Sequence, residues 1–203
     1  MSVKILTVGV FQVNCYIVQP NRSSSSVFVI DPGDEGKRIV GYLEREGLKP
    51  IAVLLTHTHL DHIKGCMDVA DHFGVKVFVP DADVAMFLSD ENEFAPWLYR
   101  DCAFPEPTAL SKAPDFDFEV IETPGHTRGG VCYYFKGLAS VFTGDTLFKQ
   151  GVGRTDLPGG CHTTLIRSIK EALFGLPEDT VVYPGHGPES LIGDEKRMNP
   201  AVY

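Results

Sequence analysis

Short apolar runs and amphipathic stretches follow one another along the first half of the chain. Short runs rich in Val, Ile and Leu and bounded by turn residues predict β-strands. Such runs lie at residues 3–10, 14–18, 27–30, 51–55 and 76–79. Apolar residues at helical spacing predict one helix over residues 35–46, ended by Gly47, and a second over residues 63–73, ended by Gly74.

The second half of the chain contains more strand-like runs and one helical stripe. Further strand-like runs lie at residues 118–121, 138–142 and 180–183. A helical stripe is formed by Leu165, Ile169, Leu173 and Leu176. Strands that alternate with helices indicate a layered α/β fold.

Residues 90–117 form the least regular part of the chain and are rich in Pro and aromatic residues. Long irregular stretches are often functional loops, so part of this segment is a candidate lid over a substrate entrance. The alternative is a surface helix and loop that buries Trp97. Both interpretations remain open at this point.

Composition restricts the class of protein. The chain has 203 residues, of which 43% are hydrophobic and 22% charged, so residues 1–203 are expected to form a single domain. A net charge of −9 disfavours nucleic acid as a partner. No apolar run reaches the length of a membrane span, and the N-terminus lacks the pattern of a signal peptide.

The cysteines favour a reducing compartment. There are five, an odd number, at scattered spacings and without a C-x-x-C pair. A cytoplasmic location is therefore expected. Cys161 follows a Pro-Gly-Gly turn and is interpreted as an inert residue at a helix start, with a reactive thiol as the alternative.

The segment Thr56-His57-Thr58-His59-Leu60-Asp61-His62 carries the strongest chemical signal. It follows the strand predicted at residues 51–55, and a continuing strand would point His57 and His59 the same way. Because an extended residue spans ~3.3 Å, the segment offers three imidazoles and a carboxylate within about 10 Å. Such ligands suit Zn, Fe and Mn better than Ca or Mg.

Three other strand-like runs each end in a turn that contains Gly and a ligand-type residue. These residues are His126, Asp145 and His186. Together with His57, His59, Asp61 and His62 they make seven candidate ligands, more than one tetrahedral ion needs. Two ions that share one ligand fit this number. His72 and His162 are interpreted as ordinary residues.

The same motifs, in this order, resemble the signature of the metallo-β-lactamase superfamily. Within it the chain is most similar to the glyoxalase II-like (hydroxyacylglutathione hydrolase-like) branch. The segments that carry this resemblance are Thr143–Phe148, Gly151–Gly160 and Pro184–Pro188. The resemblance implies a four-layer αββα sandwich with the metal site at one edge of two sheets. A carboxylate at position 145 argues against the true β-lactamase branch.

The resemblance also implies which residues hold which ion. One ion would be held by His57, His59 and His126; the other by Asp61, His62 and His186; Asp145 would bridge the two. Asp61 would in addition orient a metal-bound hydroxide. The implied cofactors are two divalent ions, with zinc preferred and iron or manganese as alternatives.

The implied substrate is a small-molecule thioester such as S-lactoylglutathione. Three departures from the branch weaken the link to glutathione. No C-terminal glutathione-binding helical domain is expected, Gly187-Pro188 replaces a Tyr, and a Lys and a Tyr of the glutathione-contacting loop correspond to Arg154 and Asp156. Arg154 keeps the positive charge and is the candidate substrate-binding residue. A structural salt bridge to Asp156 is the alternative.

Two rival functions remain open. A mononuclear-iron persulfide dioxygenase would use His57, His126 and Asp145, and the Gly153–Asp156 element is similar to that branch. A non-catalytic metal-binding scaffold is the second rival, although all seven ligand types are present. No membrane or nucleic-acid partner is expected, and the sequence gives no indication of the oligomeric state.

Overall fold

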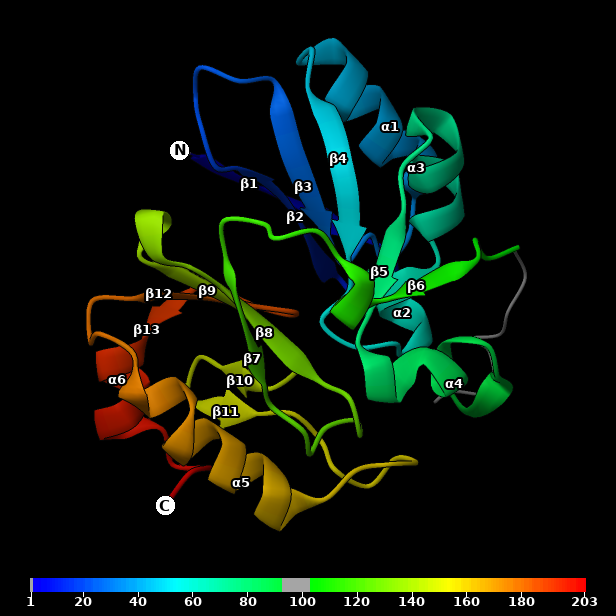
Figure 1. Cartoon of the computed structure of the whole chain (residues 1–203). Coiled ribbons are helices and arrows are strands. Elements are labelled where there is room, and N and C mark those ends of the chain that lie inside the picture. The colour runs from blue at the N-terminus through cyan, green and yellow to red at the C-terminus, as the bar shows by residue number, and fades with distance from the viewer. Residues whose placement is uncertain (1, 93–102) are drawn as a thin grey trace. The chain divides into compact units, whose positions relative to one another are not determined.

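The computed structural model describes residues 2–92 and 103–203. The chain folds into two compact units, Met1–Asp115 (unit 1) and Phe116–Tyr203 (unit 2). Each unit contains a β-sheet with helices packed against it, which confirms the expected α/β class (Figure 1).

Unit 1 contains a six-stranded mixed sheet with the strand order β1-β2-β3-β4-β5-β6. The strands are β1 (Ser2–Val8), β2 (Val13–Gln19), β3 (Ser26–Ile30), β4 (Lys49–Leu54), β5 (Val77–Val79) and β6 (Pro107–Ala109). Strands β1 to β3 pair antiparallel, whereas β3 to β6 pair parallel. Because neighbouring parallel strands end at the same edge, the segments that follow β3 and β4 meet: the Asp31 N–H donates to the Leu54 carbonyl at 3.1 Å.

Helices α1 (Gly36–Arg45) and α3 (Cys66–Phe73) pack against each other and against β4 (Figure 1). Their apolar faces bury Ile39, Leu43 and Val69 in one core with β-branched residues of the sheet. The short helices α2 (Leu60–Ile63) and α4 (Val84–Phe87) are the other α-helices in the described residues of this unit.

The helix expected over residues 63–73 is confirmed from Cys66 to Phe73, with its end at Gly74, but its start differs because Ile63 belongs to the separate helix α2. The chain forms α2 and then α3, with a break at Lys64 and Gly65. A Cβ on Gly65 would lie only 2.7 Å from the Pro32 carbonyl oxygen, so this break lets the loop after β3 pack directly against the backbone.

Unit 2 contains a five-stranded sheet with the order β13-β12-β9-β8-β7 and a separate two-stranded hairpin, β10-β11. The strands are β7 (Glu119–Glu122), β8 (Val131–Phe135), β9 (Ser140–Gly144), β10 (Leu147–Phe148), β11 (Gly151–Val152), β12 (Val181–Pro184) and β13 (Ser190–Leu191). β9 and β12 are parallel, and β8 runs antiparallel between β7 and β9. The carboxyl ends of β7, β9 and β12 therefore share one edge.

Helices α5 (His162–Glu171) and α6 (Ile192–Met198) supply the helical part of unit 2 (Figure 1). Leu165 and Ile169 of α5 pack in one core with residues of β7, β8, β9 and β12. The predicted helical stripe extended to Leu176, but α5 ends at Glu171 and a 3-10 turn over Leu173–Gly175 follows. Leu173 remains fully buried in the same core.

The candidate lid falls largely outside the described residues. Residues 93–102, including Trp97, are not described, so the lid and its alternative both remain untested. The described parts of residues 90–117 contribute β6 at the edge of the sheet of unit 1 and short 3-10 turns.

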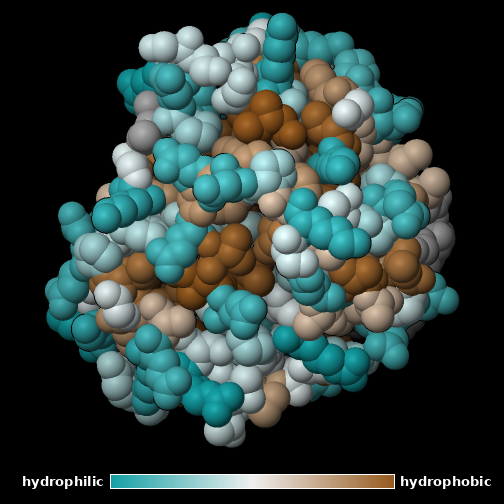
Figure 2. Space-filling model, viewed as in Figure 1, coloured by the Kyte–Doolittle hydropathy of each residue, from teal (hydrophilic) through white to brown (hydrophobic). Residues whose placement is uncertain are grey.

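Polar residues cover much of the visible surface of each unit, and hydrophobic residues reach that surface between them (Figure 2). Exposed large hydrophobic residues occur in both units, among them Val10, Leu88 and Met198. Among the helices of the described residues, none is both long and apolar enough to cross a membrane.

Candidate metal centre

The first group of candidate ligands lies in unit 1, just after β4. The strand ends at Leu54, so His57 and His59 lie in the following loop rather than on a continuing strand. Their rings nevertheless lie close together, with centroids 5.0 Å apart. Asp61 and His62 follow on α2, and the His62 ring lies 4.1 Å from the His57 ring. All four side chains are buried.

Asp31, which directly follows β3 and belongs to none of the ligand motifs, supports this group. Its carboxylate accepts the Thr56 N–H at 2.8 Å and the Thr56 hydroxyl at 2.6 Å. Nδ1–H of His62 donates to the same carboxylate at 3.1 Å. The Thr56 hydroxyl donates its proton to Asp31, so the Thr56 hydroxyl oxygen accepts Nδ1–H of His57 at 3.1 Å. Both imidazoles are therefore fixed with Nδ1 protonated and Nε2 available as a ligand atom.

A glycine brings the loop after β3 against this group. A Cβ on Gly33 would overlap the carbonyl oxygen of Asp61, so only glycine allows this approach. Asp31 itself has φ of 49°, a left-handed conformation that Asp tolerates better than most residues. The signal that was available in the sequence is the segment Asp31-Pro32-Gly33 directly after a strand.

The second group lies in unit 2, at the shared edge of its sheet. His126 follows β7, Asp145 follows β9 and His186 follows β12. The Gly185 N–H donates to the Gly144 carbonyl at 2.8 Å, which places Asp145 and His186 side by side. Oδ2 of Asp145 lies 3.7 Å from Nε2 of His126 and 3.6 Å from Nε2 of His186.

The backbone of the segment after Asp145 orients His126. Its Nδ1–H donates to the Arg154 carbonyl at 2.7 Å, so Nε2 is the ring nitrogen that faces Asp145. A Cβ on Gly153 would overlap the carbonyl oxygen of Asp145. Gly153 therefore plays the same part in unit 2 that Gly33 plays in unit 1.

The distances within each group fit a divalent metal. Two ligand atoms ~2.1 Å from one ion at a tetrahedral angle are about 3.4 Å apart. The pairs measured at 3.6 and 3.7 Å in unit 2, and that of His62 Nε2 with Asp61 Oδ2 at 3.8 Å in unit 1, lie near this value. They are too long for strong hydrogen bonds. Imidazole and carboxylate groups that are buried or partly buried, with several of the rings oriented by hydrogen bonds, thus form a donor set that suits divalent ions.

Arg154, the candidate substrate-binding residue, forms an ion pair in unit 2. Its guanidinium donates two hydrogen bonds to Asp156, at 2.7 and 2.8 Å. Both side chains are exposed. The hydrogen bond from Arg154 lowers the pKa of Asp156 to about 2 and raises the pKa of Arg154. The salt bridge foreseen as the alternative role is therefore present.

Cys161 is exposed at the N-terminal end of α5. Its N–H donates to the Gly125 carbonyl at 2.7 Å, one residue before His126. The Thr164 hydroxyl donates to its sulfur at 3.2 Å and, together with the Thr164 N–H, lowers the pKa of the thiol. His72 forms an exposed pair with Glu44 at 2.8 Å, and His162 lies exposed in the first turn of α5.

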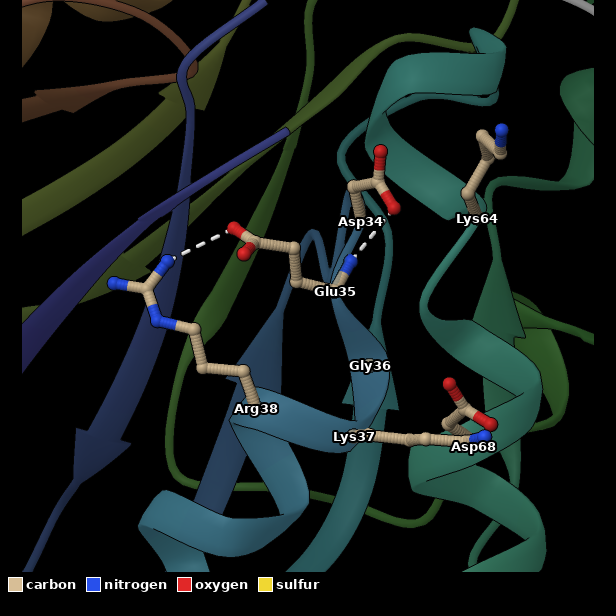
Figure 3. Close-up of a pocket in the computed structure, with 7 residues that line it drawn as sticks. All are labelled: Asp34, Glu35, Gly36, Lys37, Arg38, Lys64 and Asp68. Atoms are coloured by element: carbon tan, nitrogen blue, oxygen red, sulfur yellow. Dashed lines mark hydrogen bonds and ion pairs between the residues drawn. The ribbon is translucent and has the colours of Figure 1, made fainter. Parts of the chain in front are cut away.

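Unit 1 also has a shallow cavity of about 390 Å³ between the start of α1 and the start of α3 (Figure 3). It is lined by Asp34, Glu35, Gly36, Lys37, Arg38, Lys64 and Asp68. Arg38 donates to Glu35 at 2.8 Å, and Asp34 accepts the Glu35 N–H at 2.7 Å. Three acidic and three basic side chains balance one another, so the cavity favours neither sign of charge.

The sheets, the helices and the two ligand groups define a metal-binding α/β protein. The family model described as metallo-beta-lactamase superfamily matches residues 8–186, and the chain belongs to this superfamily. A hydroxyacylglutathione hydrolase of Haemophilus influenzae, GloC, is 35% identical over 212 residues, covering 98% of this chain and 97% of its own. This membership supports metal-dependent hydrolysis as the class of chemistry.

Solved structures agree with the family and the fold. The protein TTHA1623 in a di-iron-bound form has a TM-score of 0.83 and 35% identity, covering 98% of this chain and 99% of its own. The B3 metallo-beta-lactamase BLEG-1 has a TM-score of 0.79 and 34% identity, with 99% of both chains covered. The metallo-β-lactamase fold expected from the sequence is thus confirmed.

Proposed function

We propose that this protein is a binuclear metallohydrolase that cleaves thioesters, similar to glyoxalase II. The observation that carries the proposal is the pair of His and Asp groups, buried in unit 1 and partly buried in unit 2, in which Asp31, Thr56 and the Arg154 carbonyl orient the rings of His62, His57 and His126. The two ions follow the assignment that the family resemblance implies. One ion would be held by His57, His59 and His126, the other by Asp61, His62 and His186, and Asp145 would be the ligand that they share.

When bound, two divalent ions would lower the pKa of a water toward ~7 and would stabilise developing negative charge. The residues of the chain then have distinct tasks. Asp61 accepts a hydrogen bond from the attacking water and orients it toward the carbonyl carbon. Asp31 and the Arg154 carbonyl hold the imidazoles in one tautomer.

Thioesters suit this site because a thiolate leaves without needing a proton. The 35% identical relative GloC, which is named a hydroxyacylglutathione hydrolase, supports the same substrate class. In the proposal Arg154 holds a carboxylate of the substrate. To do so it exchanges Asp156 for that carboxylate, which an exposed ion pair permits at little cost.

The first experiment measures the metal content of the purified protein together with hydrolysis of S-lactoylglutathione. About two metal ions per chain, with turnover that a chelator abolishes and added zinc restores, is the expected result. The control is Asp179→Ala, which removes an exposed carboxylate of unit 2 outside the ligand groups. A protein that binds two ions but cleaves no thioester would contradict the proposed substrate class.

Two further assays separate the neighbouring activities of the superfamily. Oxygen uptake with glutathione persulfide, together with one iron per chain, would favour the dioxygenase that uses His57, His126 and Asp145. Hydrolysis of a β-lactam in preference to thioesters would place the chain with relatives such as BLEG-1. We expect neither outcome.

A further inference from the structure

A buried polar cluster in unit 2 lies outside the ligand group and holds the β10-β11 hairpin. Glu195 on α6 has an exposed fraction of 2%, and Asn199, which follows α6, is fully buried. One carboxylate oxygen of Glu195 accepts the Gln150 N–H and the Asn199 side-chain amide, both at 2.8 Å. The same amide donates to the Gly151 carbonyl at 3.0 Å and the Phe148 carbonyl at 3.4 Å. These bonds join the end of α6 to the turn of the hairpin.

The hairpin needs such support because it is short. Its strands pair at only two positions, Leu147 with Val152 and Phe148 with Gly151. Gln150 in its turn has φ of 57°, a conformation that costs free energy in a non-glycine residue. A two-stranded hairpin of this size is not stable by itself, so contacts from outside must fix it.

All three candidate ligands of unit 2 contact the hairpin or the residues that flank it. Asp145 stands two residues before β10. Arg154, two residues after β11, orients His126 through its carbonyl. The Phe148 ring lies 6.3 Å from the His186 ring. A shift of the hairpin would therefore change the positions of His126, Asp145 and His186 together.

We propose that Glu195 and Asn199 are positioning residues for the metal ligands of unit 2, acting through the β10-β11 hairpin. The inference rests on the proposed metal centre and adds residues that no ligand motif contains. A buried carboxylate with no cation among its described hydrogen-bond partners is costly, and the hydrogen bonds it accepts offset this cost. Those bonds end on the hairpin that follows Asp145 and whose Phe148 ring lies beside the His186 ring.

The test compares metal affinity with stability in matched variants. Glu195→Ala and Asn199→Ala each remove part of the cluster, whereas Glu195→Gln keeps an acceptor oxygen at the same place. Ile169→Val, in the core of unit 2 on α5, is the control for lost packing. The metal-free proteins are compared by melting temperature. Zn²⁺ affinity is measured by competition with a chromophoric chelator, and Co²⁺ binding by its visible spectrum.

We expect Glu195→Ala and Asn199→Ala to weaken Zn²⁺ binding about 10–100-fold and to change the Co²⁺ spectrum, the scale for residues that support metal ligands. Glu195→Gln is expected to stay within about threefold of the wild type, because an acceptor oxygen remains. Ile169→Val should lower the melting temperature with little change in affinity.

Equal affinity losses in Glu195→Ala and Ile169→Val, at similar losses of melting temperature, would overturn the inference. If Glu195→Ala does not fold, Asn199→Ala decides, and unchanged Zn²⁺ affinity in that variant overturns it as well. Thioester hydrolysis by the wild type is measured in parallel. Loss of metal affinity in the variants of a protein without thioesterase activity would refute the proposed substrate and leave the positioning role intact. A wild type that binds neither ion would overturn both.

Discussion

The two units build their ligand groups in different ways. Unit 1 takes four candidate ligands from residues 57–62, one loop and the short helix α2. Unit 2 takes three from the ends of β7, β9 and β12, which are far apart along the chain. The group of unit 1 is buried throughout, whereas the His186 side chain is 28% exposed.

The two units also differ in the kind of hydrogen-bond acceptor that orients their imidazole rings. In unit 1 a side chain, Asp31, orients His62 directly and His57 through Thr56. In unit 2 a backbone carbonyl, that of Arg154, orients His126. A side chain can be removed by substitution and a backbone carbonyl cannot. Mutations should therefore test the orienting hydrogen bonds of unit 1 directly, and that of unit 2 only through changes in backbone position.

Replacing a ligand in either unit is expected to have the largest effect. We expect His57→Ala and Asp145→Ala each to lower kcat/KM for S-lactoylglutathione by at least ~100-fold, the scale for loss of one electrostatic contribution to the transition state. Steady-state kinetics and elemental analysis provide the measurement. Asp179→Ala should leave both unchanged. Full metal content and activity in Asp145→Ala would show that the group of unit 2 is not part of the centre.

The next largest effect is expected from Asp31→Asn. Asn tolerates the positive φ of this position, but it loses the charge and sets an N–H₂ group against Nδ1–H of His62. We expect Zn²⁺ affinity to fall ~10–100-fold and the melting temperature of the metal-free protein to fall as well. Glu35→Asn, at another positive φ, is the matched control. Unchanged affinity in Asp31→Asn would contradict the orienting role.

Glycine substitutions compare the two units on equal terms. Gly33→Ala and Gly153→Ala would each press a methyl group onto the carbonyl of an Asp ligand. We expect each to destabilise the protein by about 1–3 kcal/mol, the usual cost of overpacking. Gly41→Ala, with open space around it, and Gly151→Ala, with one ordinary contact at 3.9 Å, are the controls. Denaturant unfolding measures all four, and equal stabilities for Gly153→Ala and Gly151→Ala would refute the close approach.

Arg154→Ala tests the substrate contact in unit 2. If Arg154 holds a substrate carboxylate, its loss should raise KM ~10-fold, the value of one charged hydrogen bond. Asp156→Ala removes the competing partner and should leave KM unchanged or lower it. If kcat/KM were unchanged in Arg154→Ala for every anionic thioester tested, only the salt bridge would remain as its role.

The smallest effect concerns Cys161. Among the described cysteines, Cys15, Cys66 and Cys132 are buried, and burial and nearby Asp31 raise the pKa of Cys15. Because the pKa of Cys161 is lowered, more of it is thiolate at a given pH, so iodoacetamide should modify it first. Thr164→Val removes the hydroxyl donor and should move the pH midpoint of alkylation upward. Mass spectrometry of the labelled peptides measures the rate at each cysteine. A rate at Cys161 no faster than that at Cys15 would contradict the prediction.

The chain pattern predicted the strands and helices well where apolar residues were continuous. It placed α1 and the strands β3 and β5 within a few residues of their observed bounds. It failed at Gly65 and at the end of α5, because there the contacts of a distant loop and the packing of unit 2 decide whether the helix continues.

The sequence by itself determined the kind of chemistry available. Three imidazoles and a carboxylate in six positions, followed by His126, Asp145 and His186 after strand-like runs, already indicated metal ligands. This information is local, because residue types and their spacing within a short segment need no tertiary structure.

The tertiary structure decided which residues hold those ligands in place. Asp31 meets Thr56 and His62 only because β3 and β4 are parallel neighbours that end at the same edge. Glu195 meets Gln150 only because α6 packs beside the β10-β11 hairpin. Hydrogen bonds between residues so far apart depend on strand register and helix packing, which residue spacing along the chain does not specify.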